Sequence, residues 1–471
     1  MAGSKSSLPA RFPLRPHPLP AAGQDKNLAA RDLAVNWHPY TQMHECGKFP
    51  PLPIVRARGL KLYDAGGNFY YDTISSWWCN VHGHCHPRIR RAVSRQLATL
   101  DHVLFAGFTH PPAVALSERL LALAPRGLQR VFYSDDGSTA VETALKLSLQ
   151  YRYNRNERGR REFVALDHGY HGDIFGAMSV SGVGDFTRPF APLCFPCQRV
   201  PAPYCYRCPL GKTYPACRVA CLKPLAQLLA RRARRITALV IEPLVLCAGG
   251  MIAYPPAYLR GAARLARRYG VQVITDEVAT GFGRTGTRFA CEQARVAPDF
   301  LCLGKGLTGG TITLGATLTT EKVYRAFCSP QRGRTFFHGH TFTANPVACA
   351  AALASLELFR KERTLARVQP VIRQFHAALA EFRDLPFVGD VRGCGLIGAL
   401  ELVADRKTKR PLGRAAMLAL YRAGLRRHLL LRPLGNVLYF FLPPALRPRE
   451  LSAIMRAARA VLAGTSGSPT R

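Results

Sequence analysis

The chain has 471 residues, of which 48% are hydrophobic and 20% are charged, a composition typical of a globular protein with more than one domain. No stretch approaches the roughly 20 consecutive apolar residues that cross a membrane, so we expect no membrane partner. The 65 basic and 29 acidic residues give a net charge of +36, but the one short basic run, Arg231 to Arg235, is typical of the solvated end of a helix. We therefore expect no nucleic-acid partner.

Residues 1–35 are predicted to form a disordered leader, because the segment SKSSLPARFPLRPHPLPAAG is rich in proline and poor in acidic residues. A mitochondrial targeting segment is the alternative. The start of the chain contains no apolar signal segment, and 15 cysteines in a chain of this length suit reduced thiols better than a small disulfide scaffold. A cytoplasmic protein is therefore expected.

Residues 36–85 contain a hairpin-like segment, VRARGLKLYDAGGNFYYDT, which we expect to pack with a small domain. Residues 86–345 alternate short apolar runs such as EFVAL, VQVITDE and FLCLG with helical patterns such as TAVETALKLSLQYRY. This alternation predicts a large α/β domain with a mainly parallel sheet. Residues 346–471 begin with a long helical region and continue with short strands, which predicts a smaller α+β domain.

Ligands of parallel sheets collect beyond the carboxyl ends of the strands, and two candidate catalytic residues lie there. Lys305 follows FLCLG between two glycines, where its amine can point toward a ligand and attack an aldehyde. Asp276 ends VQVITD, and a carboxylate at a buried strand end requires a cationic partner such as a pyridinium nitrogen. In isolation, Asp276 could instead cap a helix.

Two further elements suit a phosphorylated planar cofactor. Gly137 and Ser138 lie between a strand and a helix, where free N–H groups and the helix dipole can bind phosphate. An ordinary capped helix start has a similar sequence. Tyr170, in DHGYHGD, could stack on a planar ring or pack in the core.

The segments TDEVATGFGRTG, LGKGLTGG and HGHTFTANPVACAAA occur in this order, and from Trp37 to about Pro444 the chain resembles class III aminotransferases of the fold type I superfamily. The resemblance implies pyridoxal 5′-phosphate as the cofactor, bound to Lys305 as a Schiff base. It implies that the remaining cofactor contacts come from Asp276, Gly137, Ser138, Tyr170, Glu242 and Thr341. Thr341 is expected to act across the interface of a homodimer.

The segments WHPYTQM and ISSWWCNVHGHCHP are most similar to those family members that convert 8-amino-7-oxononanoate to 7,8-diaminononanoate for biotin. The resemblance implies S-adenosylmethionine as the amino donor, although lysine serves some relatives. It implies a substrate pocket formed by Tyr40, Trp77, Trp78, Gly339 and Arg432, in which Tyr40 also has a catalytic role and Arg432 binds the substrate carboxylate. Leu246 and Cys247 depart from the Gln and Gly that are more usual in the family.

A cysteine-rich insertion, residues 194–221, contains Cys205, Cys208, Cys217 and Cys221. Four thiolates could hold zinc or an iron–sulfur cluster, but buried thiols are the preferred interpretation, and no metal is expected. His82, His84 and His86 alternate in VHGHCHP and could likewise form a metal cluster, but they are expected to shape a loop on the substrate side.

Two alternative functions remain open. One is an ω-amino acid or diamine aminotransferase that uses pyruvate or 2-oxoglutarate. The other is a non-catalytic basic binding protein with the same fold, against which the presence of both Lys305 and Asp276 argues.

Overall fold

The computed structural model describes residues 27–465, which divide into two compact units. The first unit comprises the described residues up to Ala57 together with Leu62–Phe69. It contains α1 (Leu28–Val35), a 3-10 turn (Met43–Glu45) and most of β1 (Ile54–Arg58) and β2 (Lys61–Asp64). These two strands and β3 (Phe69–Tyr71) form a sheet in the order β1-β2-β3, of which Arg58, Lys61, Tyr70 and Tyr71 count toward the second unit. The last eight residues of the predicted leader thus form a helix, and residues 1–26 of that leader lie outside the described residues.

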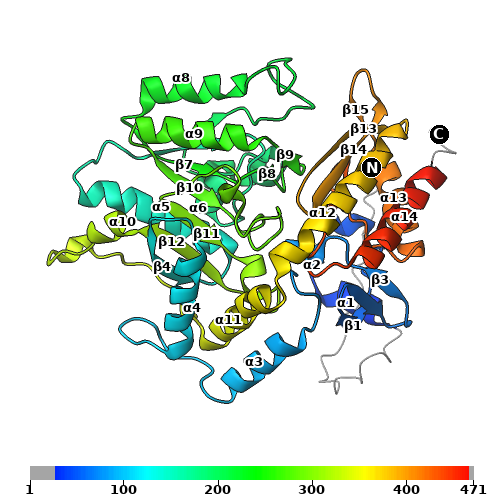
Figure 1. Ribbon diagram of the computed structural model, residues 1–471, viewed down its shortest axis with the longest axis horizontal. Coiled ribbons are helices and arrows are strands. Elements are labelled where there is room, and N and C mark those ends of the chain that lie inside the picture. The colour runs from blue at the N-terminus through cyan, green and yellow to red at the C-terminus, as the bar shows by residue number, and fades with distance from the viewer. Residues whose placement is uncertain (1–26, 466–471) are drawn as a thin grey trace, which may run out of the picture. The chain divides into compact units, whose positions relative to one another are not determined.

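The second unit is built on a seven-stranded sheet (Figure 1) with strand order β4-β12-β11-β10-β7-β5-β6. The strands are β4 (Leu128–Ser134), β5 (Glu162–Leu166), β6 (Gln198–Val200), β7 (Ile236–Ile241), β10 (Gln272–Asp276), β11 (Phe300–Leu303) and β12 (Gly315–Thr320). Only β12 runs antiparallel to its neighbours in this sheet. The prediction of a mainly parallel sheet is confirmed.

Helices cover both faces of this sheet because its central strands are apolar on both sides. In β7, Leu239 and Ile241 join the core that contains α4 (Pro111–Leu123), α8 (Lys223–Arg232) and α9 (Pro256–Arg268). The intervening residues Ala238 and Val240 join the core beneath α5 (Gly137–Asn154). Figure 1 shows α8 and α9 stacked on one side of the sheet.

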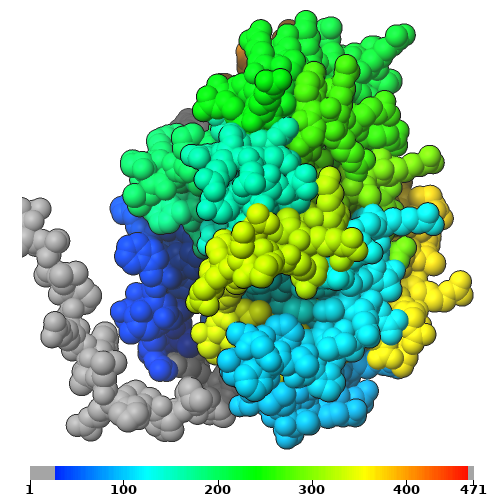
Figure 2. All heavy atoms as spheres, turned by 90° about the vertical axis from the view of Figure 1, so that its left-hand side faces the viewer, coloured from blue at the N-terminus to red at the C-terminus, as the bar shows by residue number. Residues whose placement is uncertain are grey.

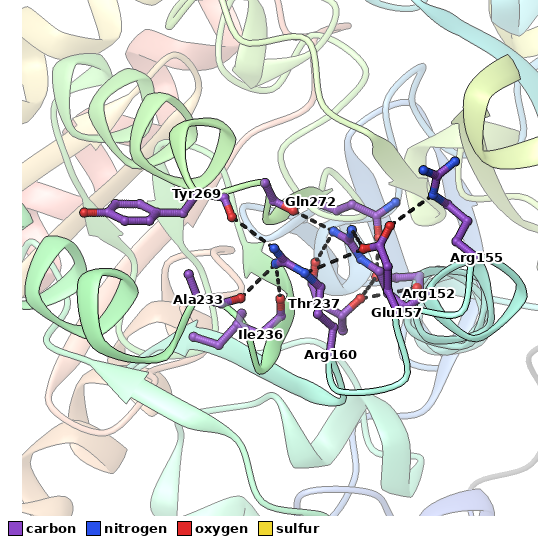
Figure 3. Close-up of polar contacts among 11 residues, drawn as sticks. Arg152, Arg155, Glu157, Arg160, Ala233, Ile236, Thr237, Tyr269 and Gln272 are labelled. Atoms are coloured by element: carbon purple, nitrogen blue, oxygen red, sulfur yellow. Dashed lines mark hydrogen bonds and ion pairs between the residues drawn. The ribbon is translucent and has the colours of Figure 1, made fainter.

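Arginines organise the amino-terminal edge of the sheet, where α5, α8 and α9 end (Figure 3). Arg152 donates to the carbonyl oxygen of Gly270 at 2.7 Å, and Arg160 donates to those of Ala233, Ile236 and Tyr269 at 2.8, 3.0 and 3.3 Å. Glu157 forms ion pairs with Arg152, Arg155 and Arg160. Carbonyl groups at helix ends lack intrahelical partners, so these arginines fix the helices to the sheet at the edge remote from the strand ends that carry Asp276 and Lys305.

The C-terminal region contains a second core. Its strands β13 (Val388–Cys394), β14 (Ile397–Asp405), β15 (Arg410–Pro411) and β16 (Val437–Phe441) pair antiparallel, and α12 (Thr364–Ala380), α13 (Arg414–Arg426) and α14 (Pro448–Thr465) pack with them. In contrast, buried residues of α11 (Pro346–Lys361) belong to the core of the large sheet. The predicted domain boundaries stay predictions.

Shorter elements connect these layers. They are α2 (Ser75–Trp78), α3 (Pro87–Leu97), α6 (Phe175–Ser179), α7 (Gly184–Thr187), β8 (Val245–Leu246), β9 (Ile252–Ala253) and α10 (Glu321–Arg325). Across residues 27–465, no helix is both long enough and apolar enough to cross a membrane.

Candidate active site

Three adjacent parallel strands carry two of the predicted catalytic residues, Asp276 and Lys305, and the predicted cofactor contact Glu242 at their carboxyl ends. Asp276 is the last residue of β10, Glu242 follows β7, and Lys305 follows β11 after one glycine. Lys305 adopts a left-handed backbone conformation with φ of 42°. A Cβ added at Gly304 would lie 3.0 Å from the Cα of Gly137, so the lysine turn lies directly against the start of α5. The structure therefore brings Lys305 and the predicted phosphate loop together.

The amine of Lys305 faces an aromatic wall. Its Nζ lies 5.0 Å from the centre of the Trp78 ring, and that ring stacks on Phe441 at 5.4 Å and donates from Nε1 to the Tyr439 hydroxyl at 3.3 Å. Among the described residues, no carboxylate forms an ion pair with Lys305. The amine thus lies beside a fixed, buried ring and is not held in a structural salt bridge.

Asp276 is buried and pairs with His171, whose Nδ1 lies 2.8 Å from Oδ2 of Asp276. The other oxygen, Oδ1, accepts a hydrogen bond from the backbone N–H of Val278. The Nε2 atom of His171 is buried without a hydrogen-bond partner in the described structure. We did not expect His171 from the sequence, although it directly follows Tyr170, because the contact spans 105 residues.

Glu242 connects Tyr170, the predicted ring-stacking residue, to the segment of Leu246 and Cys247. Its carboxylate accepts hydrogen bonds from the backbone N–H groups of Tyr170 and Cys247, both at 2.9 Å. Burial raises the pKa of Glu242 to about 7, and nearby Asp276 acts in the same direction. The Cys247 thiol is fully buried, and burial raises its pKa well above the usual range, so it is a neutral group beside the site.

The start of α5 fits a phosphate group. Asp136 caps the helix by accepting from the Thr139 N–H at 2.9 Å, and the first turn, which begins with Gly137 and Ser138, contains no acidic side chain. A Cβ at Gly137 would lie 2.4 Å from Cγ1 of Val278, so only glycine fits between the helix and the strand ends. Among the described contacts, the Asp136 carboxylate accepts only from Thr139, so the N–H groups of Gly137 and Ser138 remain available for an anion.

These residues together fit pyridoxal 5′-phosphate. The first turn of α5 suits the phosphate, and the buried carboxylate of Asp276, which has only a histidine as its side-chain partner within residues 27–465, suits a pyridinium nitrogen. Lys305 supplies an amine without a competing ion pair. The backbone N–H of Tyr170 donates to Glu242, which places Tyr170 beside these strand ends. Its ring packs edge-on against Phe186, with the ring centres 6.2 Å apart.

The predicted substrate residues Trp77 and Trp78 lie in a strained turn. Residues 75–78 all have positive φ, between 45° and 74°, which is costly for side chains other than glycine. Arg284, which is 1% exposed, holds this turn by donating to the Ser75 hydroxyl at 2.9 Å and to the Trp78 carbonyl oxygen at 3.1 Å. Its burial lowers the pKa of Arg284 to about 9. In the sequence, Arg284 is marked only by its place in the family segment GFGRTG.

Trp77 and Arg432 meet although 355 positions separate them. The guanidinium of Arg432 lies 4.7 Å above the Trp77 ring, and the ring is 37% exposed. No described carboxylate pairs with Arg432. An aromatic wall next to an unpaired guanidinium is suited to an apolar chain that ends in a carboxylate.

Three predicted residues are not brought to Lys305 by the described contacts. Tyr40 belongs to the first unit and is 45% exposed, so its place in the substrate pocket stays a prediction. Gly339 and Thr341 are exposed in the segment that precedes α11. Their roles also stay predictions.

The alternating histidines have separate partners. His84 pairs with Asp72 at 2.9 Å, His82 contacts the Ser355 hydroxyl at 3.1 Å, and His86 caps α3. Burial lowers the pKa of His82 to about 3. They connect the loop of residues 82–86 to the rest of the unit, and its place on the substrate side stays a prediction.

The cysteine-rich insertion docks on the C-terminal sheet. Arg207 donates to the carboxylate of Glu401 at 2.6 Å, and the Tyr204 hydroxyl donates to the same carboxylate. All the cysteines of the insertion are free thiols. Between residues 27 and 465, no group of three or more His, Cys, Asp or Glu side chains is arranged to hold a metal ion.

The fold and this site are those expected of an aminotransferase that uses pyridoxal 5′-phosphate, and comparison with known proteins supports this assignment. Residues 42–462 match the family model described as aminotransferase class-III, and the chain belongs to this family. The chain is 45% identical to the adenosylmethionine-8-amino-7-oxononanoate aminotransferase of Nitratidesulfovibrio vulgaris, over 94% of this chain and 82% of that protein.

Solved structures extend the comparison. A crystal structure of adenosylmethionine-8-amino-7-oxononanoate aminotransferase from Methanocaldococcus jannaschii matches with a TM-score of 0.89 and 38% identity, over 93% of this chain and 99% of the other. An amine transaminase from an uncultivated Pseudomonas species, in the PLP-bound form, matches with a TM-score of 0.88 and 35% identity, over 92% and 99%. The predicted family, fold and cofactor are confirmed.

Proposed function

We propose that this aminotransferase converts 8-amino-7-oxononanoate to 7,8-diaminononanoate, a step of biotin synthesis, with S-adenosylmethionine as the amino donor. The relatives named for this reaction support the proposal. The observation that carries it is the pairing of Arg432 with Trp77, because a long aliphatic keto acid ends in a carboxylate that an unpaired guanidinium can bind. A cytoplasmic location is part of the proposal and is supported by 15 free cysteines.

Asp276, Lys305 and the first turn of α5 each have a separate role in the reaction. Pyridoxal 5′-phosphate, when bound, supplies an aldehyde that accepts amines and a ring that stabilises negative charge. Asp276, held in place by His171, keeps a proton on the ring nitrogen, and the first turn of α5 binds the phosphate. The Nζ of Lys305 takes the proton from the substrate carbon that bears the nitrogen, and later returns a proton to the acceptor carbon.

The pocket residues position both substrates in turn. Arg284 holds the Ser75–Trp78 turn, so that Trp78 forms a rigid wall beside Lys305. Arg432 fixes the carboxylate of the keto acid, which places the ketone at a set distance from that end. Because both substrates use one pocket, we expect ping-pong kinetics.

We also propose a homodimer. The segment before α11 lies on the surface in yellow-green, above the blue-cyan residues of α3 and α4 (Figure 2). Several of its side chains and those of the loop before α4 are apolar and strongly exposed, namely Phe337 (68%), Phe342 (57%), Leu104 (52%) and Phe108 (58%). Exposed apolar clusters are typical of subunit interfaces. Thr341 lies in the same segment, in keeping with a phosphate contact made across the interface.

The test is product formation by the purified holoenzyme. Incubation with S-adenosylmethionine and 8-amino-7-oxononanoate should yield 7,8-diaminononanoate, identified by mass spectrometry, and double-reciprocal plots should be parallel. Lysine, β-alanine and putrescine serve as alternative donors. Efficient transfer from β-alanine or putrescine to pyruvate, with no diaminononanoate formed, would instead assign the ω-amine reaction.

A further inference from the structure

A second charged feature lies at the amino-terminal edge of the large sheet, remote from Lys305. The loop that enters β5 and the loop that enters β7 are neighbours, because β5 and β7 pair in parallel from Glu162 and Ile236 onward. Arg160 joins the two loops through its hydrogen bonds to Ala233 and Ile236 (Figure 3). The sequence places one basic run at Arg231 to Arg235, but the fold sets a second run beside it.

The two loops together carry a strong positive charge. Residues 155–162 and 231–236 contain two glutamates, Glu157 and Glu162, against eight arginines: Arg155, Arg158, Arg160, Arg161, Arg231, Arg232, Arg234 and Arg235. Both glutamates are already occupied by arginines. Arg158, Arg161, Arg231 and Arg234 are exposed and have no carboxylate partner among the described residues.

A hollow of about 470 Å³ opens between these loops, and we call it the basic hollow. Arg161, Arg232 and Arg235 line it together with Leu149, Phe163 and Phe195. Glu162 accepts from Arg232 at 2.8 Å and from Arg235 at 2.7 Å, which fixes two guanidiniums at one place, and Arg235 remains 66% exposed. Phe195 is 38% exposed and lies 5.7 Å from Phe163.

We propose that the basic hollow and the surrounding arginines bind single-stranded nucleic acid. An exposed aromatic ring that lines the same hollow as three arginines is suited to an unstacked base attached to a phosphate backbone. A duplex keeps its bases stacked on one another, and inorganic polyphosphate has no base. Neither can therefore stack on Phe195, and both would bind this surface through its positive charge alone. The run Arg231 to Arg235 alone did not predict a nucleic-acid partner. Phe195 and the arginines of residues 155–161 lie beside this run only in the folded chain.

The test is fluorescence anisotropy with the holoenzyme and a labelled oligothymidylate of about 12 nucleotides, at roughly 50 to 200 mM salt. Phe195→Ala should weaken binding about tenfold, because loss of one stacked base has an effect of that order. The double variant Arg161→Gln/Arg235→Gln should reduce the slope of log K against log salt by about 1.4, or about 0.7 per lost phosphate contact. Arg456→Gln, which removes an exposed charge on α14, is the matched control and should leave affinity nearly unchanged.

Aminotransferase activity and the midpoint of thermal unfolding should be unchanged in these variants, which excludes misfolding as the cause. Undiminished binding by Phe195→Ala, or equal competition by a duplex or by inorganic polyphosphate, would overturn the proposal in favour of charge attraction alone. Equal affinity for thymidine monophosphate would overturn it in favour of a mononucleotide pocket. Absence of binding at the lowest salt concentration would also overturn it.

Discussion

Replacement of Arg432 by Gln should selectively impair use of the long keto acid. The guanidinium stacks on Trp77 at 4.7 Å and has no carboxylate partner within residues 27–465, so its donors are free for a substrate carboxylate. A hydrogen bond to a charged group contributes about 1.5–3 kcal/mol, which corresponds to a roughly 10- to 150-fold loss in kcat/KM for 8-amino-7-oxononanoate. Arg432→Lys should recover only part of this loss, because an ammonium cannot form the bidentate contact.

The assay measures initial rates at saturating S-adenosylmethionine, with the keto acid varied. The half-reaction with the donor alone, followed by cofactor absorbance, should proceed at nearly the wild-type rate, which separates loss of carboxylate binding from general damage. Arg456→Gln on α14 is the matched control. A kcat/KM for the keto acid within about twofold of wild type, below the range expected for a charged hydrogen bond, would refute the assignment of Arg432.

Three further changes test other parts of the structure. Gly137→Ala should weaken cofactor binding, measured by equilibrium dialysis, because its Cβ would lie 2.4 Å from Val278; unchanged affinity would contradict the tight phosphate turn. Glu157→Gln should lower the unfolding free energy by about 2 kcal/mol, since it removes the charged hydrogen-bond acceptor of the buried Arg152, while kcat remains unchanged; an unaltered unfolding midpoint would contradict this. In cofactor-free protein, Glu242 has a pKa raised from its ordinary 4.5 to about 7, so the folded state binds the proton more tightly and the associated stability is full below pH 4.5 and lost as pH rises through 7. Thermal unfolding measured from pH 4.5 to above pH 7 should therefore show wild type losing stability relative to Glu242→Gln as the pH rises. A stability difference that stays constant over this range would refute the assignment.

The sequence predicted the parts of the site that follow from local patterns. Asp276 ends one apolar strand and Lys305 closely follows another, and the carboxyl ends of parallel strands meet at one edge, so their proximity could be predicted. Gly137 could likewise be assigned to a turn between a strand and a helix.

Contacts between distant segments could not be predicted in this way. His171 reaches Asp276 across 105 residues, and Arg284 reaches the carbonyl oxygen of Trp78 across 206 residues, with no periodicity that connects them. Similarly, the hollow floored by Phe195 exists only because β5 and β7 are neighbours. Such contacts depend on the order of strands in the sheet, which local patterns do not determine.

The central claim is that Lys305 holds the cofactor and moves the proton. Reduction of the yellow holoenzyme with borohydride, followed by proteolysis and mass spectrometry, tests it most directly. The phosphopyridoxyl label should be found on the peptide containing LGKGLTGG, at Lys305, and Lys305→Ala should abolish both the label and transamination. A label on any other lysine, or turnover by Lys305→Ala at the wild-type rate, would contradict the claim.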